Sequence, residues 1–171
     1  TQPWKRSALV KYALVISVDG LRPDLLLRGN TPNLHQLLTT STYTMWARTT
    51  ALAITLPSHV SMLTGYNPEH HGVLWNSELP EGKQEYPKVP TIFEVAKGQG
   101  LTTGMASGKT KFLAMNRGGA LDWYFLPKTT DSDHDVAIAA CKIIKEHQPQ
   151  LMFVHFAGVD VAGHASGWSS K

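Results

Sequence analysis

Two largely apolar runs, far apart in the chain, constrain its fold more than any other feature. Tyr12–Val18 stops at Asp19-Gly20, and Leu151–Phe156 stops at Ala157-Gly158. Apolar runs of this length that end at turn residues are typical of buried parallel strands. Parallel strands need crossover connections, which are usually helices, so the sequence predicts an α/β fold.

Helix signals fill the chain between these two runs. Prolines that suit a first helical turn, with their neighbouring cap residues, predict helices over residues 31–38, 57–63 and 90–97. Asp131-Ser132-Asp133 is expected to cap a longer helix, and residues 102–106 and 123–126 are weaker strand candidates. Residues 78–88 are polar and without periodicity, which indicates a surface loop. The pattern predicts a doubly wound, mainly parallel sheet with helices on both faces.

Length and composition place the chain among single globular domains. It has 171 residues, of which 42% are hydrophobic, and no internal repeat or domain linker is evident. The formal net charge of +3 comes from scattered Lys and Arg rather than from a basic block. A stable complex with nucleic acid is therefore not expected. Composition leaves the oligomeric state open.

The cysteine count and the hydropathy argue against a disulfide framework, a cysteine-based zinc site and a membrane span. The single cysteine, Cys141, lies in a helix-like run where a buried thiol is expected, and it supports neither a disulfide nor a cysteine-based zinc site. No apolar run reaches the roughly 18 residues of a membrane span, and residues 1–6 lack the apolar core of a signal peptide. An exported, periplasmic or extracellular location is favoured, and a cytosolic one stays open.

Two acidic residues follow the two predicted strands. Asp19 comes directly after the first strand, and Asp160 follows the second by a few residues. Ligands of open α/β sheets gather outside the carboxyl ends of the strands, so both carboxylates are expected at one edge. His164 lies four residues after Asp160, a spacing that lets an oxygen and an imidazole nitrogen face one metal ion. Taken alone, Asp19 is better explained as a turn residue and His164 as a solvated loop residue, whereas together with Thr55 they favour a metal site.

Thr55 lies between these two clusters and supplies a hydroxyl. Pro57 suits the first turn of a helix, so the hydroxyl of Thr55 is expected near a helix N-terminus. Backbone N–H groups there favour an anion such as phosphate. A simple N-cap role is the alternative, and the two roles are compatible. A threonine hydroxyl is a weak nucleophile that needs a metal or base, which the two clusters could supply.

Five sequence blocks stand in a characteristic order: Val15–Asp24, Thr31–Leu34, Thr55–Gly65, Pro68–Val73 and Asp160–His164. Five blocks in order are far more specific than any single motif. Together they resemble those of the type I phosphodiesterase/nucleotide pyrophosphatase family in the alkaline phosphatase superfamily. The resemblance implies the fold of that superfamily and the metal-dependent hydrolysis of phosphate esters or nucleotides.

The resemblance also implies roles for individual residues and two divalent ions, expected to be zinc. Asp19 would bind one ion and Asp160 with His164 the other, while Thr55 bridges as the nucleophile that forms a phosphothreonine intermediate. Asn76 falls where the family places an asparagine that holds a phosphoryl oxygen. The Leu56 amide is expected to stabilise charge on the same group.

Two lysines could extend this substrate site. Lys109-Thr110-Lys111 follows a weak strand candidate, and some bacterial relatives, including phosphonoacetate hydrolases, carry Lys-x-Lys or Lys-x-Arg in this part of the chain. Such cations would favour a dianionic monoester over a diester. Two solvated surface lysines are an equally open interpretation.

Departures from related patterns refine the prediction. Sulfatases carry Cys or Ser at the nucleophile and Arg downstream, so Thr55 and His59 disfavour sulfuryl transfer. The family's remaining ligands follow the Asp-x-x-x-His block, and this sequence ends at Lys171. Residues 1–171 are therefore expected to form the N-terminal part of one catalytic domain, with each ion keeping only part of its ligands. The alternative function is a non-catalytic fragment that binds metal or phosphate without turnover.

Overall fold

A four-stranded parallel sheet forms the centre of the protein. The computed structural model describes residues 10–78, 85–127 and 133–169. The strands lie in the order β1 (Ala13–Val18), β4 (Leu151–Phe156), β2 (Thr103–Ser107) and β3 (Trp123–Phe125), and every neighbouring pair is parallel. The two predicted apolar strands thus pair with each other directly, and the two weaker strand candidates are confirmed.

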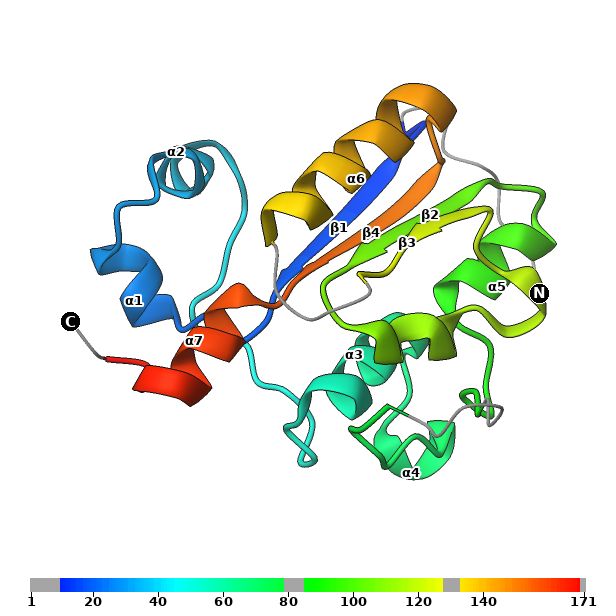
Figure 1. Cartoon of the computed structure of the whole chain (residues 1–171), viewed down its shortest axis with the longest axis horizontal. Helices are drawn as coiled ribbons and strands as arrows, with labels where there is room; N and C mark the ends of the chain where they lie inside the picture. The colour runs from blue at the N-terminus through cyan, green and yellow to red at the C-terminus, as the bar shows by residue number, and fades with distance from the viewer. Residues whose placement is uncertain (1–9, 79–84, 128–132, 170–171) are drawn as a thin grey trace.

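Helices cover both faces of this sheet, as the alternating pattern predicts. In Figure 1, α6 runs along the strands on one face, and α3 and α5 lie on the other. The α3 and α5 side carries the larger apolar cluster, which includes the fully buried Leu56, Phe93 and Phe153. The helices are α1 (Pro23–Arg28), α2 (Pro32–Thr40), α3 (Thr55–Thr64), α4 (Pro68–His71), α5 (Ile92–Gly98), α6 (Asp133–His147) and α7 (Gly158–Ser166), with short 3₁₀ turns η1 (Thr110–Met115) and η2 (Arg117–Gly119).

Strand register brings three polar residues together near the carboxyl end of the sheet. Ser17 of β1 and Ser107 of β2 both lie opposite His155 of β4. All three precede the turns that leave the sheet, and His155 and Ser107 are fully buried. Buried polar groups need hydrogen-bond partners. This row of three polar residues therefore makes the protein interior polar near the carboxyl ends of the strands.

Two local predictions need correction. Helix α3 begins at Thr55, two residues before the predicted start at Pro57, and Ile54 is its N-cap, so Thr55 does not act as an N-cap. Cys141 is exposed on α6 rather than buried, because the buried face of that helix is formed by Val136, Ala140 and Ile143. The predicted cap residues Asp131 and Ser132, part of the loop over residues 78–88 and the segment 1–6 lie outside the described residues.

The prediction that the first apolar run is a buried strand is wrong, because β1 is an edge of the sheet and none of its residues is buried. Leu14 and Ile16 are 52% and 55% exposed, because α6 packs over β2, β3 and β4 and leaves this end of the face bare. An exposed apolar edge strand is a template for pairing with another chain.

We expect this 171-residue chain to self-associate through β1. Ile16→Lys should shift it toward the monomer, because a lysine on an edge strand opposes edge-to-edge pairing. Size-exclusion chromatography with light scattering measures the molecular mass. The control is Ile138→Lys, which changes an exposed apolar side chain on α6. An unchanged mass distribution for Ile16→Lys would place the contact elsewhere.

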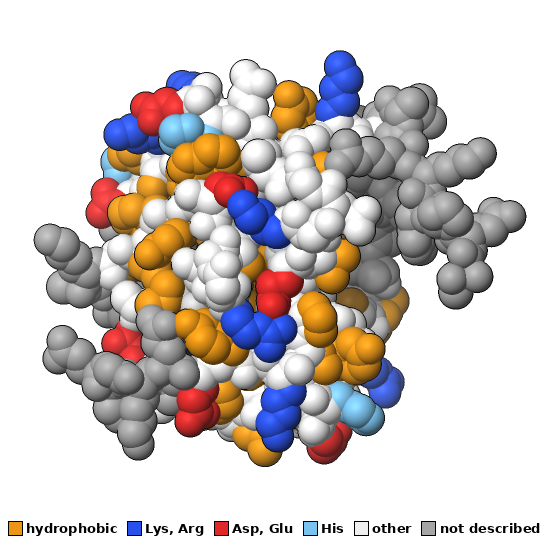
Figure 2. Space-filling view, turned by 90° about the vertical axis from the view of Figure 1, so that its right-hand side faces the viewer, with side chains coloured by type: hydrophobic (Ala, Val, Ile, Leu, Met, Phe, Trp, Pro, Cys, Tyr) orange, Lys and Arg blue, Asp and Glu red, His pale blue; other side chains and the backbone are white. Residues whose placement is uncertain are grey.

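The surface agrees with the charge pattern of the sequence. Figure 2 shows one face on which Lys and Arg side chains are scattered among apolar and acidic ones instead of forming a basic tract. In the part of the chain that the structure describes, no helix has the length and apolar character needed to cross a bilayer.

Candidate active site

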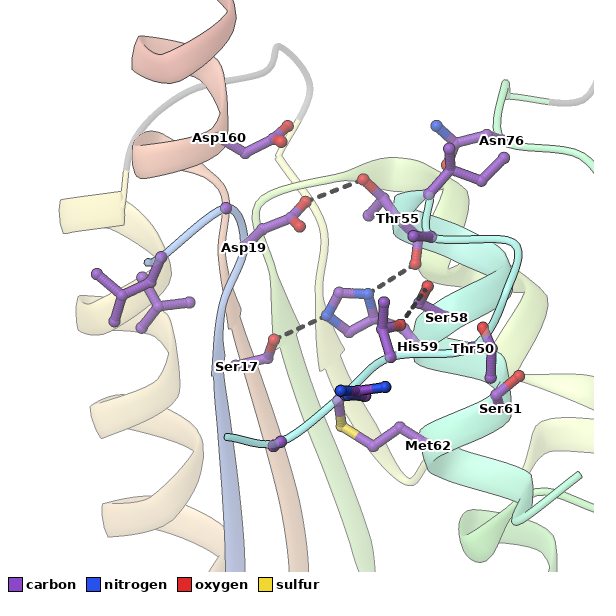
Figure 3. A pocket seen from close by; sticks show the side chains of 18 of the residues that line it. Ser17, Asp19, Thr50, Thr55, Ser58, His59, Ser61, Met62, Asn76 and Asp160 are labelled. Carbon is purple, nitrogen blue, oxygen red and sulfur yellow. Dashed lines mark hydrogen bonds between the residues drawn. The ribbon is translucent and has the colours of Figure 1, made fainter. Parts of the chain in front are cut away.

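Asp19, Thr55 and Asp160 meet at the carboxyl edge of the sheet. Asp19 follows β1, Thr55 opens α3, and Asp160 lies in the first turn of α7 after β4. The Thr55 hydroxyl donates a hydrogen bond to Asp19 Oδ2 at 3.0 Å. Figure 3 shows both carboxylates near the Thr55 hydroxyl, with Asn76 on the far side of it. The predicted convergence of residues far apart in the sequence is thus found in the structure.

A glycine allows the two acidic segments to approach closely. Gly20 has φ of +73°, and a Cβ at this position would lie 2.8 Å from the Cα of Asp160. The Trp168 indole N–H donates to the Gly20 carbonyl at 2.9 Å, which ties α7 to the turn after β1. The Asp133 carboxylate accepts hydrogen bonds from the backbone N–H groups of Ala157 and Gly158, which fixes the turn that leads into α7. Backbone contacts therefore set the spacing between the two acids.

The Lys109 ammonium lies between the two carboxylates. Its Nζ is 2.6 Å from Asp19 Oδ2, 2.7 Å from Asp160 Oδ2 and 3.3 Å from Thr55 Oγ1. All three charged side chains are largely buried, with 12%, 12% and 15% exposure for Lys109, Asp19 and Asp160. Burial opposes ionisation of Asp19, yet the His155 ring nearby and the hydrogen bond from Lys109 outweigh it and hold its pKa well below its ordinary value. Two carboxylate oxygens thus share one cation.

Asn76, Leu56 and Lys111 form a second group beside Thr55. Asn76 Oδ1 accepts from the Leu56 backbone N–H at 2.9 Å and from Lys111 Nζ at 2.9 Å. Lys111 Nζ also donates to the Asn76 carbonyl oxygen at 2.8 Å. With both donors on Oδ1, the Asn76 amide N–H₂ is the group left to meet a ligand. The structure brings these three of the four predicted substrate residues together, with the Leu56 amide hydrogen-bonded to Asn76, whereas the fourth, Lys109, pairs with Asp19 and Asp160.

His164 lies at the margin of the site. Its side chain is 71% exposed, and its Nε2 is 3.5 Å from Asp160 Oδ1. Oxygen atoms surround one cation, and they belong to Asp19, Asp160 and Thr55, with the imidazole of His164 adjacent. Oxygen and imidazole nitrogen are ligand types that zinc accepts. The residues therefore fit a divalent ion, and an ammonium stands at the point where the oxygens converge.

Two buried histidines beneath the site received no catalytic role from the sequence. His59 Nδ1 donates to the Thr55 carbonyl and its Nε2 accepts from Ser17, both at 2.7 Å, which ties α3 to β1 (Figure 3). Burial lowers the pKa of His59 and so favours the neutral ring that these bonds require. His155 lies under Asp19, with Nε2 3.5 Å from Asp19 Oδ2. A histidine inside an apolar strand was the sequence signal that could have drawn attention to it.

An open cleft leads to these groups. Its volume is about 960 Å³, and it is lined by the turn after β1, the first turns of α3, the segment before α3, and α7. Its lining includes Asp19, Thr55, Asn76, Asp160 and His164. Ligand sites are typically about 300–1,000 Å³, so the cleft has room for a molecule of nucleotide size.

Comparison with known proteins gives consistent matches. A model of the type I phosphodiesterase/nucleotide pyrophosphatase family matches residues 13–171. An uncharacterised pyrophosphatase/phosphodiesterase of Schizosaccharomyces pombe is 28% identical over 90% of the chain and 35% of its own length. Ectonucleotide pyrophosphatase/phosphodiesterase family member 3 of Rattus norvegicus is 32% identical over 90% of the chain and 20% of its own length.

Solved structures share the fold. An inactive form of murine ectonucleotide pyrophosphatase/phosphodiesterase 5 in complex with AMP has a TM-score of 0.76 and 20% identity, covering 94% of this chain and 46% of that one. Phosphonoacetate hydrolase of Sinorhizobium meliloti in complex with phosphonoformate has a TM-score of 0.69 and 19% identity, covering 87% of this chain and 47% of that one. The chain thus spans less than half the length of these relatives and structures.

Proposed function

Because the chain belongs to the type I phosphodiesterase/nucleotide pyrophosphatase family, we propose that it hydrolyses phosphoric esters with Thr55 as the nucleophile. The observation that carries this proposal is the Thr55 hydroxyl at a helix start, 3.0 Å from Asp19 and beside the cation shared with Asp160. We further propose that residues 1–171 form the N-terminal part of one alkaline-phosphatase-like catalytic domain, since they span less than half of the solved relatives.

The carboxylate and imidazole groups support two divalent ions, for which zinc is the proposed metal. Asp19 with Thr55 would hold one ion, and Asp160 with His164 the other. When bound, such ions supply Lewis-acid stabilisation of phosphoryl oxygens and lower the pKa of coordinated hydroxyl groups and water. Two protein ligands for each ion is below the usual three, which predicts weak metal binding by residues 1–171 alone.

Thr55 is oriented for attack by its own hydrogen bonds. Its proton points to Asp19 Oδ2 and one lone pair of Oγ1 accepts from Lys109 Nζ at 3.3 Å, which leaves the other lone pair for a phosphorus atom in the cleft. Attack would form the bond from Oγ1 to phosphorus as the bond to the leaving ester oxygen breaks, while the hydroxyl proton leaves Oγ1 and the departing oxygen takes up a proton from solvent. Water would then cleave the phosphothreonine, which restores the hydroxyl and releases the phosphoryl group as product. The His59 bond to the Thr55 carbonyl fixes the first turn of α3 through both steps.

The substrate site would receive phosphoryl oxygens at Asn76 and Lys111. The amide N–H₂ of Asn76 and the ammonium of Lys111 provide donors beside Thr55. The AMP complex of the murine relative supports a nucleotide as substrate, and the phosphonoacetate hydrolase likeness supports a smaller dianionic one. The rat relative is named an ectonucleotide enzyme, and on that likeness we propose an exported location.

Lys111→Ala is expected to separate monoesters from diesters. A monoester carries one more negative charge to be met by the ammonium, so its hydrolysis should fall by about 100-fold and that of a diester by less than about tenfold. Turnover of p-nitrophenyl phosphate and bis-p-nitrophenyl phosphate with zinc measures both, and Lys145→Ala on α6 is the control.

The same assay tests the proposed function as a whole. Activity toward either ester should require zinc and disappear with a chelator. Equal effects of Lys111→Ala on the two esters would remove the monoester preference only. Zinc binding without any turnover would favour a non-catalytic metal-binding fragment.

A further inference from the structure

His155 carries a buried polar atom that lacks a hydrogen-bond partner. Its side chain has 0% exposure, and among the described residues its Nε2 is the one buried side-chain nitrogen or oxygen atom without a hydrogen bond. A buried polar group left unpaired costs roughly 1–3 kcal/mol, so an apolar residue would make the sheet more stable at this position. Such exceptions in a folded protein call for a functional explanation.

Packing fixes the direction in which this nitrogen points. The imidazole lies against Phe112, with ring centroids 4.4 Å apart, and meets His59 edge-on at 5.0 Å. Its Nδ1 lies 3.4 Å from the Ser107 hydroxyl oxygen. With contacts to two rings and a neighbour on β2, the ring has little freedom to turn, and Nε2 faces Asp19 Oδ2 at 3.5 Å.

The oxygen that His155 faces already accepts hydrogen bonds from two other residues of the site. Asp19 Oδ2 accepts hydrogen bonds from Thr55 and from Lys109, at 3.0 and 2.6 Å. These donors are the Thr55 hydroxyl and the shared Lys109 ammonium, whereas His155 approaches from β4, whose four central residues are buried. If a divalent ion replaced the Lys109 ammonium, the contact of His155 with Asp19 would remain, because His155 is part of the sheet.

Other buried histidines show that this arrangement is not a general packing feature. His59 uses both ring nitrogens, as described above, and His71 pairs its Nε2 with the Ser61 hydroxyl and its Nδ1 with the Val73 backbone N–H. His71 is also fully buried. The two satisfied histidines serve the fold, while His155 directs its open nitrogen toward a residue of the proposed active site.

We propose that His155 is a positioning residue for Asp19. Its Nε2–H donates to Asp19 Oδ2 and keeps that carboxylate turned toward Thr55 when a divalent ion takes the place of the Lys109 ammonium. The inference rests on the proposed function. Partners behind a metal ligand typically change metal affinity by about 10–100-fold when they are removed.

Zinc titration calorimetry combined with urea unfolding tests this role. For His155→Leu we expect zinc affinity to fall by roughly 10–100-fold, because the partner of Asp19 is lost. Without zinc, the midpoint of urea unfolding should be equal to or above that of the wild type, because an unpaired buried polar group has been removed. His155→Gln, whose amide can donate to Asp19, should recover at least half of the loss in the logarithm of affinity.

His71→Leu is the matched control. It removes a fully buried histidine whose nitrogens are both paired, so unfolding should occur at lower urea while zinc affinity stays within about twofold. Wild-type zinc affinity in His155→Leu would overturn the positioning role, as would a joint loss of affinity and stability that His155→Gln does not repair. A wild-type chain that binds no zinc and hydrolyses no ester would overturn the proposed function, and this inference with it.

Discussion

Thr55→Ala is expected to lower the turnover of phosphate esters by several orders of magnitude and to abolish the covalent phosphoenzyme. Among the described residues, this hydroxyl is the one that lies at the start of α3 and donates to Asp19, so its removal would take away the proposed nucleophile. The phosphoenzyme can be sought by rapid acid quench and mass spectrometry of the peptide that contains residue 55. Zinc-loaded protein and p-nitrophenyl esters provide the turnover measurement.

Thr50→Ala is a suitable control for this experiment. Thr50 lines the same cleft, but its hydroxyl donates to the Leu52 carbonyl instead of the acidic cluster. It should keep turnover within a few-fold of the wild type, and its unfolding should match that of Thr55→Ala. Near-normal turnover in Thr55→Ala would remove the threonine from the mechanism.

The sequence predicted which segments meet at the site, because their meeting depends on local pattern and on strand topology. Asp19 and Asp160 each follow an apolar run, and the carboxyl ends of parallel strands meet at one edge. Thr55 was placed at a helix start by the proline two residues later, although the helix begins earlier than that proline suggests. These inferences need only the order of strands and helices.

The parts that escaped prediction depend on register and on packing between distant segments. No local pattern shows that Lys109 reaches across to Asp19 and Asp160, or that Leu56 donates to Asn76. The direction of the His155 side chain depends on the register of β4 with β1 and β2, and this register could not be predicted from the sequence. Exposure of Cys141 likewise depends on which face of α6 meets the sheet.

Lys109→Met is expected to tighten zinc binding and to destabilise the metal-free protein. The ammonium now neutralises two largely buried carboxylates, and leaving such charges unpaired costs about 3 kcal/mol. At the proposed metal site, zinc would have to displace the ammonium in the wild type but not in the variant, so most of that cost would return as affinity. About 3 kcal/mol corresponds to roughly a 100-fold change, so a gain of at least about tenfold is expected by titration calorimetry.

Lys111→Met separates this competition from a general effect of removing positive charge. Lys111 donates to Asn76 and makes no hydrogen bond or ion pair with either carboxylate, so its loss should leave zinc affinity within about twofold. Urea unfolding without zinc should show a lower midpoint for Lys109→Met than for Lys111→Met. If zinc instead bound Lys109→Met more weakly than the wild type, the ammonium would support the metal site instead of occupying it. The two acids would then need another explanation for sharing a single cation.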